Sequence, residues 1–407
     1  MLTEVIRLVK ISSFRFWLRA IACILPWNNV LSSALGLFFS VFFGIKHRLN
    51  CLDTPINRGW LFFSSWLILT TFFAYDFSLA WTGLLNFLPF ILFRAIARFL
   101  LIDFVQKIQI AWLTTLGSLF VGVLGILQIV IDRPDWQFPR LFTSYILNLG
   151  MSSDRRITSY FGHFNELAIY LLLVFPLAIF FLKNGSDQQR IIAAIALFMD
   201  SICLYFSGSR NAWTLAAMAL MAIALYYRSW RILFVLTLGG LATAWAVFGE
   251  VLGIGGEWLQ IFFPSSFVQR LQSAFDPSLS DFASTGDRLN AWKFALDLIA
   301  QRPILGWGLR SFPKIAADFS YDLRGLPHEH NFYLLLAVGA GIPAVIGFSS
   351  LIIATAWQKF QHSSTNAERD LRFLTWLAIA MFFLFSLVDV PMYEPRVNLL
   401  FWLLVAL

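Results

Sequence analysis

The sequence predicts an all-α, polytopic membrane protein with about twelve spanning helices. Of its 407 residues, 59% are hydrophobic and only 13% are charged, and the mean hydropathy is +0.72. A soluble protein would carry about 25% charged residues. The apolar residues form continuous blocks of span length and do not alternate as barrel strands do, so helices are the expected spanning element.

The apolar blocks predict twelve helices, distributed along the whole chain. A break at Pro26–Asn29 leaves open whether the first two are separate spans or one broken span. The predicted helices are 11–25, 29–45, 59–75, 79–93, 108–131, 166–182, 191–206, 211–227, 231–248, 331–355, 371–388 and 396–407.

The charge pattern predicts the orientation of these helices. The net charge is +7, but the basic residues are dispersed among the loops, so we expect no nucleic-acid partner. With both termini inside, the short basic loops alternate in agreement with the positive-inside rule. The basic N-terminus lacks a cleavage pattern and predicts a retained first helix. The three cysteines are scattered, which predicts neither a disulfide framework nor a metal motif.

Two polar segments are predicted on the outer side of a single polytopic domain that covers 1–407. The first is 132–165, and the second is a long loop at 249–330. Within the second, Ser284–Asp287 offers capping residues, and Pro303 ends the helical pattern. Apolar residues recur there at helical spacing, which predicts an amphipathic helix on the outer membrane surface: Leu289, Trp292, Leu296 and Ile299.

The segment Leu326–Asn331 is the main functional candidate. It places two histidines, a carboxyl group and a carboxamide where the long loop meets an apolar span. Ionisable groups at such a boundary are costly and mark functional sites. The predicted topology puts Arg210, Arg288 and His330 on the same face. Two guanidiniums near an imidazole predict a site for a phosphorylated ligand, with histidine able to exchange a proton.

Simpler interpretations remain open at these positions. Arginines at helix ends commonly bind lipid headgroups, which applies to Arg210 and Arg288. His330 is equally suited to hydrogen bonding at a helix start, and His328–His330 offers ligands for a metal but no third group at a recognisable spacing. Arg155 and Arg156 fit a solvated charge pair.

Several motifs in 150–407 resemble the O-antigen ligase and polymerase superfamily of bacterial membrane proteins. Arg156–Ala168 resembles the start of the family's central helix, and Ser207–Trp213 its arginine turn. Arg288–Trp292 together with Pro303–Gly308 is similar to its outer-loop signature.

The most specific likeness begins at His330. His330-Asn331, nine residues and then Gly341 match the His-Asn-x9-Gly-x-x-Gly pattern of the ligases. The last glycine of that pattern is Ala344 in this chain, a change that concerns helix packing more than chemistry because alanine is also small.

The resemblance implies a metal-independent, inverting glycosyltransferase of the C type, without a cofactor, in the bacterial inner membrane with its site facing the periplasm. The donor would be an undecaprenyl-diphosphate-linked glycan, and the acceptor a glycolipid, a glycan or another hydroxyl compound. His330 is the implied base, while Arg210 and Arg288 hold the diphosphate. We expect the substrate site also to include Arg155, Arg156, Asn165, His328 and Asn331.

The final segment, Val388–Trp402, is similar to cyanobacterial members of the same superfamily once described as bicarbonate transporters. The alternative function is therefore transport of inorganic carbon or another solute, or an accessory membrane role. A transporter would need ionisable or discontinuous elements near the membrane centre. Candidates are few, namely Asp200, Asp389 and Arg396, and the transferase is favoured, with ligase and polymerase left undivided.

Overall fold

The structure is a computed structural model that describes most of the chain from residue 53 onward. The described ranges are 53–138 apart from 100 and 102, 147–249 apart from 153, 253, 255, 257–261, 265–272, 283–361 and 365–407, with scattered positions between 18 and 45. The predicted helices at 11–25 and 29–45 therefore lie largely outside the described residues.

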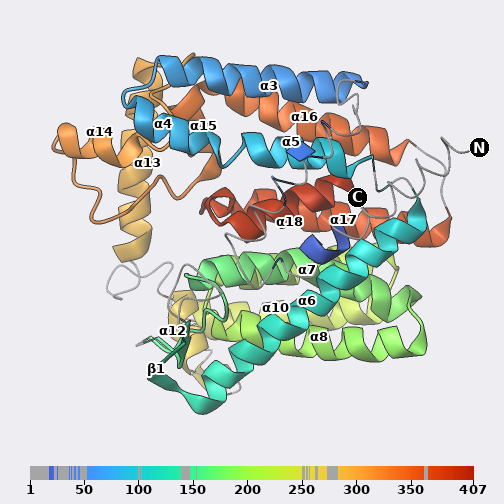
Figure 1. Cartoon of the computed structure of the whole chain (residues 1–407). Helices are drawn as coiled ribbons and strands as arrows, with labels where there is room; N and C mark the ends of the chain where they lie inside the picture. Colours follow the sequence, from blue (N-terminus) through green and yellow to red (C-terminus); the bar gives the residue numbers. More distant parts are fainter. Residues whose placement is uncertain are drawn as a thin grey trace, which may run out of the picture.

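The described part is a helical bundle with one small hairpin (Figure 1). Its elements are α3 (Pro55–Phe72), α4 (Phe77–Leu84), α5 (Leu88–Ala97), α6 (Phe104–Ile131), β1 (Arg133–Phe138), β2 (Leu147–Leu149), α7 (Phe164–Asn184), α8 (Asp187–Phe206), α9 (Arg210–Tyr226), α10 (Trp230–Phe248), α11 (Glu257–Gln260), α12 (Ser265–Gln272), α13 (Ala283–Gln301), α14 (Phe312–Asp318), α15 (Phe332–Ala340), α16 (Ile342–Phe360), α17 (Asn366–Phe385), the 3-10 turn η2 (Pro391–Tyr393) and α18 (Pro395–Ala406).

The all-α membrane fold is confirmed. Within the described residues, six helical segments are long and apolar enough to cross a membrane: Phe77–Ala97, Phe104–Ile131, Phe164–Asn184, Asp187–Phe206, Trp230–Phe248 and Ile342–Phe360. The total of twelve remains a prediction. Two predicted spans are interrupted: 79–93 becomes α4 and α5, and 331–355 becomes α15 and α16 with a break at Gly341.

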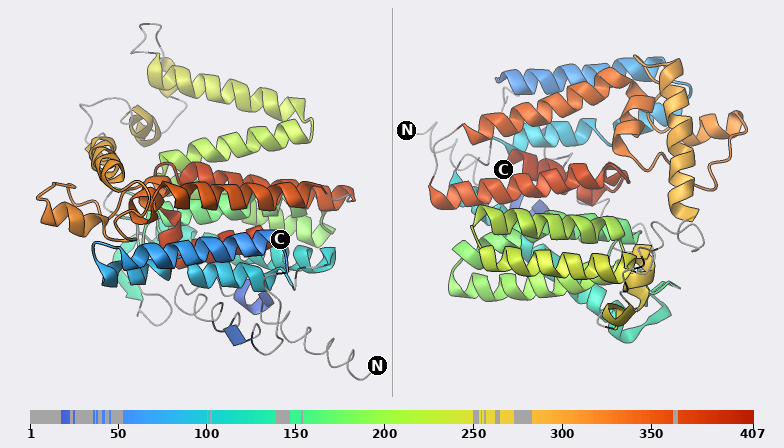
Figure 2. Two further views of the ribbon diagram at one scale, coloured as in Figure 1. Left: turned by 90° about the horizontal axis from the view of Figure 1, so that it is seen from above. Right: turned by 180° about the vertical axis from the view of Figure 1, so that it is seen from behind.

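Helix α7 lies at the centre of the bundle and packs against α6, α8, α17 and α18. It is buried over most of its length, and Leu167, Leu173 and Leu177 are fully covered. By contrast, α10 lies at one edge, as the view from above in Figure 2 shows, and only 11% of its apolar window is buried. An apolar helix with so little burial is suited to contact with lipid.

The loop at 249–330 contains the predicted surface helix, here α13, which crosses the end of the bundle roughly at right angles to the spans (Figure 1). Its buried side chains, Ala291, Ala295 and Leu298, pack with Phe312 and Ile315 of α14. Leu289 and Leu296 of the expected apolar stripe are 55% and 57% exposed, while the neighbouring face of α13 is buried against the other loop helices. That the stripe lies on the membrane surface stays a prediction.

The loop is joined to α15 by backbone hydrogen bonds at the Gly341 break. Trp307 N donates to Val338 O at 2.7 Å, Gly308 N to Gly339 O at 2.9 Å, and Ile342 N to Pro303 O at 2.8 Å. Gly341 has φ +83°, and a Cβ there would lie 1.8 Å from the carbonyl oxygen of Ile304. No side chain fits, so glycine is required for this close approach.

A buried ion pair fixes the start of α18. Arg396 and Glu394 are 0% and 1% exposed, and the Nε of Arg396 donates to Oε1 of Glu394. Arg396 also donates to the carbonyl of Tyr160 at 2.6 Å, and its guanidinium stacks 4.1 Å from the ring of Phe161. The pair therefore ties α18 to the segment that precedes α7.

Opposite ends of the bundle should face opposite sides of the membrane. We expect single cysteines at Asn366 and Arg324, in a background with the native cysteines replaced, to react with an impermeant maleimide from opposite sides. Both positions are exposed: Asn366 is the first residue of α17, and Arg324 lies in the outer loop between α14 and α15. Labelling of both from the same side would contradict the arrangement.

Removing one member of the buried pair should be costly. Arg396→Met leaves the Glu394 carboxylate uncompensated, which we expect to lower stability by about 3–5 kcal/mol. The double variant Arg396→Met/Glu394→Gln should recover much of that loss, measured as the thermal midpoint in detergent. Arg369→Gln, an exposed cation on α17, serves as the control. Equal losses in the single and double variants would contradict a pairing role.

Candidate functional site

A pocket of about 490 Å³ at the α13 end of the bundle brings together residues from seven separate stretches of the chain. Four arginines and two histidines are among its walls, and we name it the arginine pocket. These six residues are Arg156, His163, Arg210, Arg270, Arg288 and His330. All three residues expected on one face, Arg210, Arg288 and His330, are therefore in one cavity.

His330 lies at the turn into α15 and has an unusual backbone. Its φ is +47°, a left-handed conformation that costs a non-glycine residue roughly 1–2 kcal/mol. Strain of this kind concentrates at functional sites when the surroundings hold it in place. Here the amide of His330 donates to Nδ1 of His328 at 3.1 Å, which stabilises the turn.

Asp389 lies beside the imidazole of His330. Its Oδ1 lies 3.5 Å from Nδ1 of His330, longer than a normal hydrogen bond, and both side chains are 15% exposed. Its Oδ2 accepts from Nδ2 of Asn165 at 2.7 Å. Burial raises the pKa of Asp389, but the contact with His330 outweighs burial and holds the pKa of this carboxyl well below its usual range. Asp389 is thus an anion at neutral pH.

The second nitrogen of His330 is left for a ligand. Nε2 is buried and makes no hydrogen bond to any residue that the structure describes. A buried polar atom without a partner is costly and is typical of a position that a substrate satisfies. With Asp389 on the Nδ1 side, the imidazole can accept a proton at Nε2.

His328 has a supporting position. Burial lowers the pKa of His328 to about 4, helped by the charge of His330, so the ring is neutral near pH 7. This agrees with its Nδ1 acting as an acceptor for the His330 amide. His163, which sequence reasoning missed, lies on the other side of Asp389. Burial lowers the pKa of His163 as well, and its Nδ1 accepts from the Asn165 amide at 3.2 Å to begin α7.

The four arginines differ in how much of their charge is already paired. Asp154 binds two of them, with its Oδ2 2.6 Å from Arg156 Nε and 3.6 Å from Arg270 Nη2. Arg210 donates to the carbonyl of Arg270 at 3.2 Å. Arg288 has no ion pair or hydrogen bond from its side chain within the described ranges. Among the described residues that line the cavity, four arginines therefore stand against one acidic side chain, Asp389.

Gly208 allows the side chains of Arg156 and Arg270 to pack closely against the turn before α9. It has φ +64°, and a Cβ there would lie 3.2 Å from atoms of both Arg156 and Arg270. A larger residue at this turn would push the two guanidiniums apart. Arg270 itself was not predicted, because it comes from the short helix α12 and no motif marks it.

Three other expected residues have structural contacts or lie elsewhere. The side chain of Asn331 caps α15 by accepting from the amides of Tyr333 and Leu334, and it donates to the carbonyl of Leu387 at 2.8 Å. Arg155 lines an adjacent cavity rather than the arginine pocket. His328 lines another neighbouring cavity, which shares His330 with the arginine pocket.

The residues that could bind a metal differ from those that the sequence offered. Among the described residues, ligand atoms of His328, His330 and Asp389 lie within 4.8 Å of one another, whereas Glu329 is not part of the group. Burial raises the pKa of Glu329 to about 8, and its carbonyl accepts from Trp292 Nε1 at 2.9 Å. Of the three possible ligands, His328 already uses Nδ1, and both oxygens of Asp389 already accept hydrogen bonds, from Asn165 and from the Val390 amide.

The comparisons with known proteins agree with the motifs at this site. Residues 193–349 match a family model described as O-antigen ligase, and this range includes Arg210, Arg288 and His330. No curated protein matches the chain. Residues 193–349 of this multi-pass membrane protein are therefore similar to the O-antigen ligase family, and the match covers less than half of the chain.

Proposed function

We propose that the protein transfers a glycan from an undecaprenyl-diphosphate-linked donor to a hydroxyl acceptor at the outer face of a bacterial inner membrane. The family supports glycosyl transfer of the O-antigen ligase or polymerase kind. The observation that carries the finer proposal is the meeting of His330, with its unpaired Nε2, and Arg288 in one cationic pocket.

The arginines match the charge that develops on the leaving group. A diphosphate leaves with the electron pair of the bond to the sugar carbon, so its negative charge grows in the transition state. Arg288 and Arg210 would bind its oxygens through guanidinium forks. Arg156 and Arg270, which share Asp154, position this cluster and add to its field.

His330 would act as the base. The acceptor oxygen attacks the sugar carbon opposite the leaving diphosphate, its proton passes to Nε2, and the configuration at that carbon inverts. Asp389, an anion 3.5 Å from Nδ1, would stabilise the imidazolium that forms. Asn165 keeps Asp389 in place through the 2.7 Å hydrogen bond. No metal is required for these steps.

Arg288 should be needed for transfer. Arg288→Ala should reduce transfer from a lipid-diphosphate-linked glycan by 100-fold or more, about 2.7 kcal/mol of barrier, because a guanidinium aimed at the leaving group is lost. Arg288→Lys should restore only part, since a point charge cannot replace a bidentate fork. The assay uses purified protein, donor and a hydroxyl acceptor.

Arg324→Ala is the matched control for Arg288. Arg324 pairs with Asp287, the residue before Arg288, yet its side chain is 59% exposed and it does not line the arginine pocket. If both variants lose transfer equally, the effect belongs to the folding of α13 and not to the ligand.

His330→Ala should lower the transfer rate by about 10²- to 10⁴-fold, the usual contribution of a general base, while donor binding persists. His328→Ala should cost less, because His328 holds the turn and does not line the arginine pocket. Measuring rate and donor affinity separately distinguishes the two effects. Transfer that stops in EDTA and returns with a divalent cation would instead favour a metal at His328, His330 and Asp389.

A further inference from the structure

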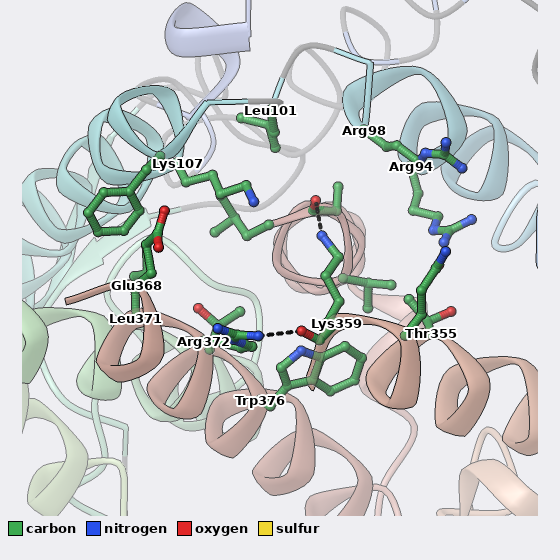
Figure 3. A pocket seen from close by; sticks show the side chains of 16 residues that line it. Arg94, Arg98, Leu101, Lys107, Thr355, Lys359, Glu368, Leu371, Arg372 and Trp376 are labelled. Atoms are coloured by element: carbon green, nitrogen blue, oxygen red, sulfur yellow. Dashed lines mark hydrogen bonds between the residues drawn. The ribbon is translucent and has the colours of Figure 1, made fainter. Parts of the chain in front are cut away.

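A second pocket lies at the opposite end of the bundle, where α5, α6, α16, α17 and α18 converge (Figure 3). Its volume is about 360 Å³, within the range of about 300–1,000 Å³ typical of small-molecule sites. Lys107 and Lys359 are both among its walls, and we name it the lysine pocket. None of its residues belongs to the arginine pocket.

The side chains that line the lysine pocket are strongly positive in sum. Among the described residues in its wall, five are basic, namely Arg94, Arg98, Lys107, Lys359 and Arg372, and one is acidic, Glu368. The balance stays positive even if a carboxylate at Leu407 is counted. In Figure 3 these cations come from different helices and surround a common space.

The carboxylate of Glu368 already accepts hydrogen bonds within the protein. Glu368 forms the capping box of α17, in which its Oε2 accepts from the Thr365 amide at 2.8 Å. With one negative charge beside five basic side chains, it cannot neutralise the cluster alone. Two of the cations are held by the start of α3: Arg94 donates to Asn57 at 2.8 Å, and Arg98 pairs with Asp53 at 3.1 Å.

The two lysines remain available to a ligand. Lys359 donates one hydrogen bond, to the carbonyl of Ala406 at 3.1 Å, and an ammonium has three donors. Lys107 makes no side-chain hydrogen bond or ion pair to residues in the described part of the chain. The buried Nε of Arg94, which also lines the pocket, likewise has no hydrogen-bond partner there.

The rest of the wall combines apolar side chains with the polar Thr355, Gln358 and Thr375. Leu101 and Val405 are 4% and 1% exposed, and the indole of Trp376 closes one side beside Lys359, as Figure 3 shows. Cations beside these apolar side chains suit a ligand with a charged head and a hydrocarbon part. Basic pockets between spanning helices at a membrane boundary are known to take anionic lipid headgroups.

We infer that the lysine pocket binds a phosphate-bearing ligand, and that this ligand is the headgroup of an anionic phospholipid. The phosphate accepts hydrogen bonds from Lys107 and Lys359, and the glycerol and first carbons of the acyl chains lie against Leu101 and Trp376. This site is separate from the proposed transfer chemistry, so either can fail without the other.

Binding can be measured on the full chain, purified in a neutral detergent and stripped of lipid. Phosphatidylglycerol should raise the thermal midpoint and remain bound in native mass spectrometry, whereas phosphatidylcholine should do neither. Removal of each lysine should weaken the binding of phosphatidylglycerol about fivefold. Lys107→Gln and Lys359→Gln together should therefore weaken it about 25-fold, if the two effects add.

Arg369→Gln is the matched control, because Arg369 lies one residue from Glu368 but does not line the pocket. An equal loss in this variant, or no loss in the double variant, overturns the proposal. If Lys359→Gln does not fold, Lys107→Gln alone tests it, since Lys107 makes no side-chain bond within the described residues.

A second arm separates the two sources of phosphate. Inorganic phosphate should displace phosphatidylglycerol only weakly if the apolar wall contributes to binding. If inorganic phosphate displaces phosphatidylglycerol at comparable concentrations, the pocket binds phosphate but the lipid is not its occupant. Equal binding of phosphatidylglycerol and phosphatidylcholine overturns both.

Discussion

The candidate site depends on one carboxylate that is largely withdrawn from water. Asp389 follows α17, yet its partners come from Asn165 of α7 and from His330, which precedes α15. A charge removed from solvent must be compensated, so each of these segments is held where its partner can reach the carboxylate. The imidazole gains a fixed orientation as a result, and a base needs such an orientation before its proton affinity matters.

The arginine pocket combines paired and less paired cations in a single cavity. Arg156 and Arg270 share Asp154 and are packed tightly over Gly208, so they form a rigid positive wall. Arg288 comes from the loop helix α13, whose Trp292 also donates to the backbone of Glu329 beside His330. A ligand phosphate would thus meet a preformed field, which reduces the cost of reorganising charges during the reaction.

The sequence was sufficient to bring Arg210, Arg288 and His330 together, because loop charges predict topology and topology predicts a shared face. Asp389, His163 and Arg270 were missed as members of the site. They lie in short turns or a short helix, and no spacing relates them to His330. The capping role of Asn331 had a readable signal, an asparagine directly before an apolar helix. The buried face of α13 could not be predicted, since it is decided by contacts with α14 and α15, which are distant in the sequence pattern.

The outer loop and α15 are connected at two places. Three backbone hydrogen bonds join residues 303–308 to the end of α15 and the start of α16, and Trp292 of α13 donates to the carbonyl of Glu329. The segments that carry Arg288 and His330 are therefore linked directly to each other. Arg210 and Arg270 come from α9 and α12, so the arginine pocket lies between a part linked in this way and a part built from different helices.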